Sequence, residues 1–284
     1  MSRPRRSALY MPASNARAVE KARNLNTDIV ILDLEDAVLP DQKDEARVAA
    51  AAAIRAGGFG RRELVIRVNA LDTPWGAADL AMAAAVAPDA VLAPKVRSAV
   101  DVQAYAARLA AAPDRTGLWV MIETVQSIFA LDAIAAAAPR LGGFVMGIND
   151  LAREMGARQT AERTPFFAAL ALAVSAARAH GLVVLDGVHN EIDDLAALET
   201  VCGQGLDFGF DGKTLIHPSH LEICNQVFSP AVADVAWARA VIAAFDAPGN
   251  TGKGALRVDG RLAEILHRDQ ARKLVAVADA IAAV

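Results

Sequence analysis

The chain has 284 residues, of which 54% are hydrophobic and 22% are charged, a balance that is typical of a globular protein and excludes a disordered one. Its net charge of −4, with no basic block beyond residues 3–6, argues against nucleic acid as a main partner. No apolar run reaches the length of a membrane span, and the apolar part of the basic N-terminus is too short for a signal peptide. We therefore expect a cytoplasmic protein with no membrane partner.

Short apolar runs alternate along the chain with alanine-rich segments of helix length. The predicted strands cover residues 7–12, 28–34, 63–69, 90–96, 118–122, 144–148, 182–187 and 206–211. The predicted helices between them cover residues 13–23, 43–56, 77–86, 100–111, 126–138, 164–180 and 192–202. Eight strands that alternate with helices predict a (β/α)8 TIM barrel. A doubly wound open sheet fits this number of strands less well, and no G-x-G-x-x-G follows the first strand.

The chain continues beyond the predicted barrel. A helix is expected over residues 232–245, a glycine-rich polar link over 247–260 and a long helix over 261–284. We therefore divide the chain into a catalytic barrel, residues 1–228, and a C-terminal helical extension, residues 229–284. Because a closed barrel holds no further element inside, this extension is expected to pack on the outside of the barrel or to act as an arm or lid on a neighbouring subunit.

Carboxylates follow the fifth and sixth predicted strands. Glu123 comes directly after one strand and Asp150 lies two residues past the other. A helix between two strands makes the strands parallel, so both carboxylates are expected at the same C-terminal edge, where barrels place their chemistry. Two hard oxygen ligands suit Mg²⁺. The alternative is that both residues only end their strands, with Asp150 as the N-cap of a helix that begins at Leu151.

Other charged residues are expected at the same edge. The guanidinium of Arg67 suits a substrate carboxylate or a developing enolate oxygen. The alternative for Arg67 is a structural ion pair with Glu35 or Asp36. Lys95 is expected to pair with Glu35, and Asp186 to cap or brace the rim.

Nine short motifs extend this interpretation over nearly the whole chain. In order they are RSALYMPASN, VILDLEDAV, RVN, PKV, IET, GINDLA, GKTLIHP, FSP and GKGALRVDGRL. Together they resemble the citrate lyase beta subunit-like family of the HpcH/HpaI aldolase superfamily, which includes malyl-CoA and citramalyl-CoA lyases and a related thioesterase. The resemblance implies a Mg²⁺-dependent carbon–carbon lyase, with Mn²⁺ as the alternative metal. Its substrate would be a β-hydroxyacyl-CoA such as malyl-, citramalyl- or citryl-CoA, which gives an oxo-acid and an acyl-CoA.

Two other activities remain open within this resemblance. One is a thioesterase that acts on malyl-CoA-type substrates. The other is a citrate lyase beta subunit that acts on a citryl thioester bound to an acyl carrier. The family also implies a homo-oligomer, a trimer or a hexamer.

The resemblance assigns roles to individual residues. It implies that Glu123 and Asp150 bind the metal and, with Arg67, the substrate, with Arg67 holding the oxo-acid. It also implies that Asp36, beside the metal waters, or Glu264, from a neighbouring subunit, is the catalytic acid/base group.

Coenzyme A is expected near the first predicted helix. Arg17 and Lys21, four residues apart, and His217 of the Ile-His-Pro segment fall where the family holds this group. From the residues alone, His217 is a ligand, a base or a structural residue at a helix start. His189 has no assigned partner.

The chain departs from the family pattern at two positions. Asn149 stands beside the metal aspartate where the family commonly has a glutamate. Glu264 stands where malyl-CoA enzymes carry an aspartate, and its side chain is one methylene longer. Glu264 either does the same work from a shifted backbone or marks a different substrate or a lost activity.

Overall fold

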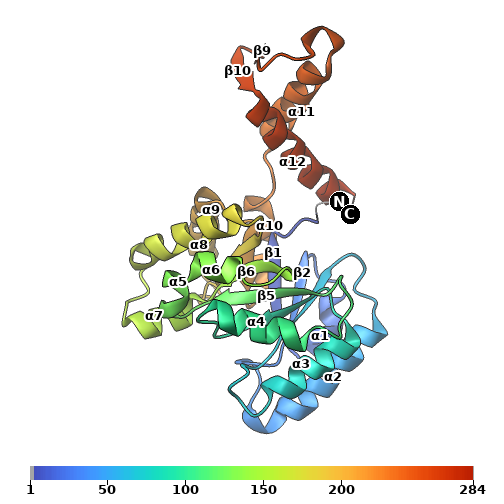
Figure 1. The fold of residues 1–284 in the computed structure, drawn as a ribbon, viewed down its shortest axis with the longest axis vertical. Coiled ribbons are helices and arrows are strands. Elements are labelled where there is room, and N and C mark those ends of the chain that lie inside the picture. Colours follow the sequence, from blue (N-terminus) through green and yellow to red (C-terminus); the bar gives the residue numbers. More distant parts are fainter. Residues whose placement is uncertain (1–2, 284) are drawn as a thin grey trace. The chain divides into compact units, whose positions relative to one another are not determined.

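The computed structural model describes residues 3–283 as two compact units, and each unit is described here by itself. The larger unit is Arg5–Phe228, and the smaller comprises residues 3–4 and 229–283. Figure 1 shows the elements of both units in chain order. No single helix among residues 3–283 is long and apolar enough to cross a membrane. One bent pair of helical segments, Pro218–Val227 and Val232–Asp246, meets that test by length and composition alone.

Eight parallel strands of the larger unit close into a barrel, because each strand pairs with the next and the last pairs with the first. The strands are β1 (Ser7–Pro12), β2 (Ile29–Asp33), β3 (Glu63–Arg67), β4 (Ala90–Ala93), β5 (Gly117–Ile122), β6 (Leu141–Met146), β7 (Val183–Asp186) and β8 (Gly212–Leu215). The predicted TIM barrel is confirmed. Its strands all run the same way, so their carboxyl ends and the residues after them meet at one face.

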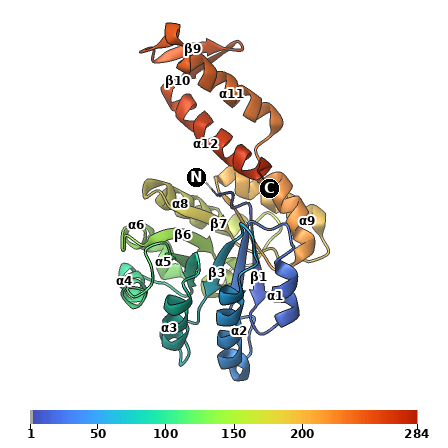
Figure 2. The same ribbon diagram turned by 90° about the vertical axis from the view of Figure 1, so that its right-hand side faces the viewer.

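Helices cover the outside of this barrel (Figure 2). They are α1 (Ala16–Ala22), α2 (Lys43–Ala56), α3 (Gly76–Val86), α4 (Ala99–Arg108), α5 (Val125–Phe129), α6 (Leu131–Ala135), α7 (Ile148–Met155), α8 (Phe167–Ala179), α9 (Leu195–Phe208) and α10 (Leu221–Val227). Short 3-10 turns precede α2, α8 and α10: η1 (Pro40–Gln42), η2 (Thr164–Phe166) and η3 (Pro218–His220). Alanine fills much of the buried helix surface, so the helices pack closely on the strands.

The eighth strand was wrongly predicted over residues 206–211. Helix α9 continues through Phe208 and ends at Gly209, whose φ of 93° only glycine adopts readily. The strand that closes the barrel is β8, which carries the fully buried Lys213. A lysine in the middle of a short strand hid this element from a search for apolar runs.

Two other boundaries differ from the prediction. The expected helix over residues 126–138 is broken into α5 and α6, and the break lets α6 bury Leu131 and Ile134. Helix α7 begins at Ile148 with Gly147 as its N-cap, so the expected N-cap role of Asp150 is wrong. Asp150 lies inside the first turn instead.

The smaller unit pairs two helices, α11 (Val232–Asp246) and α12 (Ile265–Ala282), with a two-stranded antiparallel hairpin, β9 (Ala255–Val258) and β10 (Arg261–Glu264). The turn η4 (Pro248–Asn250) follows α11. The helix expected over residues 261–284 therefore starts later, because its first residues form β10. Asp259 and Gly260 make the turn with φ values of 48° and 81°, as Asp-Gly hairpins do.

Candidate active site

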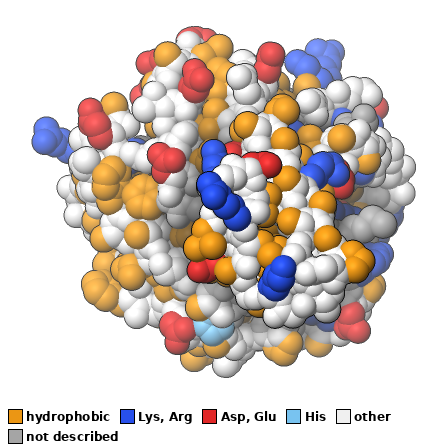
Figure 3. All heavy atoms as spheres, turned by 90° about the horizontal axis from the view of Figure 1, so that it is seen from above, with side chains coloured by type: hydrophobic (Ala, Val, Ile, Leu, Met, Phe, Trp, Pro, Cys, Tyr) orange, Lys and Arg blue, Asp and Glu red, His pale blue; other side chains and the backbone are white. Residues whose placement is uncertain are grey.

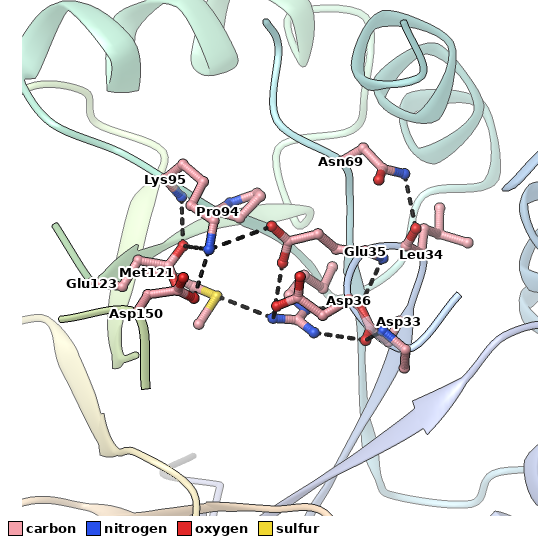
Figure 4. A network of polar contacts seen from close by, with 12 residues as sticks. Asp33, Leu34, Glu35, Asp36, Asn69, Pro94, Lys95, Met121, Glu123 and Asp150 are labelled. Atoms are coloured by element: carbon pink, nitrogen blue, oxygen red, sulfur yellow. Dashed lines mark hydrogen bonds and ion pairs between the residues drawn. The ribbon is translucent and has the colours of Figure 1, made fainter. Parts of the chain in front are cut away.

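A cavity of about 290 Å³ lies at the carboxyl ends of the barrel strands. Its charged lining residues are Asp33, Asp36, Arg67, Glu123 and Asp150. The structure therefore brings together four residues that the sequence placed in the site, and adds Asp33. Figure 4 shows how the acidic residues face one another across this space.

Asp33 fixes the position of the Arg67 side chain. The two residues are register partners on neighbouring strands, and Arg67 donates through Nε and Nη2 to the Asp33 carboxylate at 2.7 and 2.6 Å. The ring of Tyr10 lies 4.7 Å from the centre of the guanidinium. The remaining nitrogen, Nη1, lies 2.9 Å from Glu35 and 3.5 Å from Asp36. The expected ion pairs with Glu35 and Asp36 exist, but the bidentate partner is Asp33.

Lys95 connects the two proposed metal ligands. Its Nζ lies 2.6 Å from Oδ2 of Asp150 and 3.4 Å from Oε1 of Glu123, whereas Glu35 lies 3.8 Å away (Figure 4). The predicted ion pair of Lys95 with Glu35 is therefore present, and Asp150 is the closer partner. Burial tends to raise the pKa of Asp150, but its hydrogen bond and charge contact with Lys95, together with Arg153, lower that pKa below its usual range.

Glu123 is fully buried and fixed by backbone on two sides. Lys95 has a left-handed φ of 54°, and its backbone N–H donates to Oε1 of Glu123 at 2.7 Å. On the other side lies Gly147, where an added Cβ would stand 2.4 Å from Cβ and 2.5 Å from Oε2 of Glu123. Only glycine fits there. A strained lysine and a required glycine thus position one carboxylate.

Two acids in the site hold their protons unusually tightly. Burial raises the pKa of Glu35 to about 8, and although Arg67 opposes this shift, Glu123 and Asp36 add to it. Burial likewise raises the pKa of Glu123 to about 7, against the opposing charge of Lys95. Carboxylic acids that titrate near neutrality are suited to proton transfer.

The donor set fits Mg²⁺. Carboxylates are the hard oxygen donors that this ion prefers, and here they outnumber the cationic side chains. Oε2 of Glu123 is buried and has no hydrogen-bond partner within residues 3–283. In the same part of the chain no group of three or more His, Cys, Asp or Glu side chains gathers into a metal site. Glu123 and Asp150 would therefore supply the protein ligands, and water and substrate the rest.

Asp36 and Asn149 are exposed, unlike the buried acids Glu35 and Glu123. The side chain of Asp36 is 64% exposed. Asn149 takes part in an amide cluster with Asn190 and Gln159, and its own hydrogen bonds in this cluster measure 2.9 to 3.2 Å. The asparagine that departs from the family pattern thus bonds to the neighbouring loops.

The residues expected to bind coenzyme A lie on the surface. Arg17 and Lys21 are exposed on α1, and His217 is an exposed N-cap of η3 that bonds Ser219. On the face drawn in Figure 3, acidic and basic side chains are interspersed among apolar ones. Glu264 belongs to the smaller unit, where its side chain takes part in a capping box with His267 at the start of α12.

Three functional candidates were missed by the sequence analysis: Asp33, Tyr10 and Lys213. Asp33 was passed over in favour of the acids after it, although a charged residue in a buried strand is itself a signal. The Tyr10 hydroxyl is buried without a partner within residues 3–283, and Tyr10 lines the cavity. Asp186, expected at the rim, is fully buried and pairs with Lys213 at 3.0 Å and with Arg163 at 2.8 Å.

Comparison with known proteins identifies the family of this chain. The HpcH/HpaI aldolase/citrate lyase family matches residues 6–218. The chain is 48% identical over 280 residues to a (3S)-malyl-CoA thioesterase of Cereibacter sphaeroides, which covers 99% of this chain and 96% of that protein. It is 34% identical over 308 residues to an L-malyl-CoA/beta-methylmalyl-CoA lyase of the same species, which covers 99% and 97%.

Solved structures are also similar to this chain. CitE from Mycobacterium tuberculosis, in complex with magnesium, acetoacetate and coenzyme A, matches with a TM-score of 0.75 at 28% identity and covers 96% of this chain and 97% of its own. A citrate lyase beta subunit from the same organism, complexed with oxaloacetate and magnesium, matches with a TM-score of 0.67 at 29% identity and covers 79% and 96%. The resemblance drawn from the motifs is confirmed, and the chain belongs to the HpcH/HpaI aldolase/citrate lyase family.

Proposed function

We propose that this protein hydrolyses a coenzyme A thioester of the malyl class, giving the free hydroxy acid and coenzyme A. Its 48% identity over nearly the full length of a malyl-CoA thioesterase favours this activity over the carbon–carbon cleavage that the motifs first suggested. The structural observation that carries the proposal is the placement, in one cavity, of Arg67 with two carboxylates, Glu123 and Asp150, that we propose as metal ligands.

Arg67 is the proposed anchor for the terminal carboxylate of the substrate. Its bidentate bond to Asp33 and its contact with the Tyr10 ring fix the plane of the guanidinium, so little side-chain freedom is lost when the substrate binds. Arg67 would thereby orient the acyl chain in the cavity. The Tyr10 hydroxyl stays protonated, because burial raises its pKa, and is available to donate to a substrate oxygen.

Glu123 and Asp150 are the proposed ligands of Mg²⁺. A bound Mg²⁺ ion supplies Lewis-acid polarisation of the oxygen on which negative charge develops. Lys95 acts here as a positioning residue. Its backbone N–H orients Glu123, and its ammonium keeps the two carboxylates from repelling each other when no cation is bound.

Glu35 is the proposed base for the attacking water. Its raised pKa of about 8 makes its ionised form a stronger base than an ordinary carboxylate, and that form accepts the proton. The water oxygen forms a bond to the thioester carbon, the carbon–sulfur bond breaks, and the proton removed from water passes to the departing thiolate. Asp36 and Glu264 remain the proposed alternatives for this role on the basis of the family motifs.

Carbon–carbon cleavage is the second candidate, favoured by the 34% identity to a malyl-CoA lyase. In that reaction the base would remove the β-hydroxyl proton, the carbon–carbon bond would break, and the enolate of the acyl-CoA would be protonated as the oxo-acid leaves. A citryl thioester on an acyl carrier protein is the third candidate. It is distinguished by whether the isolated protein turns over free coenzyme A thioesters.

A product analysis tests the proposal. The purified protein is incubated with malyl-CoA, citramalyl-CoA and citryl-CoA in the presence of Mg²⁺, and free thiol, hydroxy acid and oxo-acid are measured separately. We expect free thiol and intact hydroxy acid in equal amounts, without oxo-acid. Release of oxo-acid without free thiol would establish the lyase reaction instead. Turnover of a carrier-bound thioester alone would support the third candidate.

Coenzyme A binding by Arg17, Lys21 and His217, and assembly into a trimer or hexamer, are further parts of this proposal. In such an oligomer Glu264 would act on the site of a neighbouring subunit. Mixing the inactive variants Glu264→Gln and Glu123→Gln, after dissociation and reassembly, is expected to restore part of the activity, because mixed oligomers contain some sites with both residues intact. If the mixture stays inactive although the variants assemble together, Glu264 does not act between subunits.

A further inference from the structure

A second cavity, of about 210 Å³, lies beside the active-site cavity. Ile148 and Val188 line both spaces, so these two side chains form a shared wall. Phe166, Ala197 and Val201 also belong to the apolar part of the lining, and most of the other lining residues are polar. The mechanism described above uses none of the polar residues of this second cavity.

Three residues of the second cavity each carry a buried polar atom without a hydrogen-bond partner within residues 3–283. The atoms are Nη2 of Arg163, Oγ1 of Thr160 and Nε2 of His189. The side chain of Arg163 is only 9% exposed, and its other nitrogens are occupied by Gln204 and Asp186. A guanidinium, a hydroxyl and an imidazole can all donate hydrogen bonds, so the site offers donors that lack an acceptor.

Arg163 also belongs to a buried cluster of charged side chains. Arg163 and Lys213 share one carboxylate, Asp186, at 2.8 and 3.0 Å, and both Lys213 and Asp186 are fully buried. The buried cluster of these three groups carries a net positive charge, which a nearby anion would stabilise, and Glu191 and Asp194 in the lining of the cavity already supply negative charge beside it. Arg163 also holds a left-handed φ of 54°, a strained conformation that this position keeps.

We infer that the second cavity is a binding site for a small monocarboxylate with a short apolar chain. The carboxylate would accept hydrogen bonds from the unpartnered donors and lie beside the guanidinium of Arg163. The apolar chain would pack against Ile148, Val188 and Phe166. Glu191 and Asp194 also line the cavity and would repel a second anionic group, so the site selects a monoanion over phosphate or a dicarboxylate. A water molecule takes up about 30 Å³, so the volume admits only a few carbon atoms.

Titration of the full-length protein with butyrate and, separately, with inorganic phosphate tests this inference. We expect saturable butyrate binding that persists in Glu123→Gln, and much weaker phosphate binding. This result does not depend on which reaction the active site catalyses. If butyrate does not bind, the cavity holds water only and the inference is wrong. If phosphate binds equally well, the assignment to a monocarboxylate is wrong.

Variants of the donors locate the binding. The double variant Thr160→Val/His189→Leu removes two donors and leaves Arg163 with its partners, so butyrate affinity should fall about tenfold or more. Ala197→Leu, which fills the space from α9, should abolish binding by a separate route. Thr200→Val, on an exposed face of the same helix, is the matched control and should bind as the unaltered protein does. Undiminished binding by the folded double variant or by Ala197→Leu would place butyrate elsewhere and overturn the inference.

Discussion

The ammonium of Lys95 lies 2.6 Å from Oδ2 of Asp150, in the space between the two carboxylates that would hold a metal ion. A cationic side chain thus stands where a divalent cation is expected to act. The same residue orients Glu123 through its backbone, which requires a left-handed conformation. Lys95 therefore has two effects: its ammonium offsets the charge of the two carboxylates, and its backbone fixes the position of Glu123.

Replacing Lys95 by Met should destabilise the metal-free protein and increase its response to Mg²⁺. Above about pH 7, where Glu123 is ionised, Glu123 and Asp150 repel each other without the ammonium, a loss of about 1–3 kcal/mol for a pair that is partly open to solvent. Thermal unfolding with a chelator and with Mg²⁺ measures both effects. Lys273→Met, on the exposed surface of α12, is the control and should change neither value. An unchanged Mg²⁺ response in Lys95→Met would show that the ammonium does not compete with the cation.

The stability of the metal-free protein should depend on pH in a defined direction. The folded protein raises the pKa of Glu35 to about 8 and of Glu123 to about 7, well above the usual value of 4.5. The stability that their protonated forms contribute is therefore fully present below about pH 4.5 and is lost as the pH rises through 7 to 8. Mg²⁺ requires ionised Glu123, so the stabilisation by Mg²⁺ should grow over the same interval.

Unfolding temperatures measured with and without Mg²⁺ across this interval check the prediction. In Glu123→Gln the Mg²⁺ response should be small at every pH, because the amide neither titrates nor binds the ion well. A large Mg²⁺ response in the unaltered protein that does not change between pH 6 and 9 would contradict raised pKa values at these carboxyls (about 7 and 8).

Tyr10 and Tyr105 provide a matched test of the unpartnered hydroxyl in the active site. Tyr10→Phe removes a hydroxyl that has no partner within residues 3–283, so stability should hold while kcat/KM falls about tenfold if that hydroxyl meets the substrate. Tyr105→Phe removes bonds to the Leu71 amide and the Pro94 carbonyl, so it should lose about 1 kcal/mol of stability and keep its kcat. Unchanged kcat/KM in Tyr10→Phe would remove this residue from the mechanism.

Gly147 should be irreplaceable because of its contact with Glu123. The Cβ of Gly147→Ala would displace the Glu123 carboxylate, so we expect loss of Mg²⁺ binding and a fall in kcat of about a hundredfold. Gly203→Ala meets no atom within 4 Å inside α9 and should gain up to about 1 kcal/mol of stability with normal activity. Normal turnover by Gly147→Ala would mean that Glu123 does not need its present position.

The sequence predicted the barrel and most of its site because strand ends are marked by abrupt changes from apolar to charged residues. Arg67, Glu123 and Asp150 all follow this rule, and the structure brings them to one cavity. The Asp33–Arg67 pair was missed because it depends on the register between neighbouring strands, which a single sequence does not display.

The eighth strand was lost for a different reason. Lys213 is compensated by Asp186 and by the carbonyl of Gly187, partners far along the chain that make a polar residue acceptable in the barrel core. Position 212 also requires glycine, because a Cβ there would lie 1.9 Å from the carbonyl oxygen of Arg5. The sequence alone does not show this close approach. Apolar runs in the sequence predict elements that are buried through their own apolar side chains. They do not reveal an element such as β8, whose polar side chain is buried because partners elsewhere in the chain stabilise it.

The most direct test of the central claim measures thiol release from malyl-CoA as a function of Mg²⁺, in the unaltered protein and in Glu123→Gln. The account predicts Mg²⁺-dependent release of free thiol by the unaltered protein, abolished by a chelator and reduced at least a hundredfold in the variant. Equal thiol release by the two proteins, or release that a chelator does not affect, would contradict a reaction carried out at the Glu123–Asp150 site.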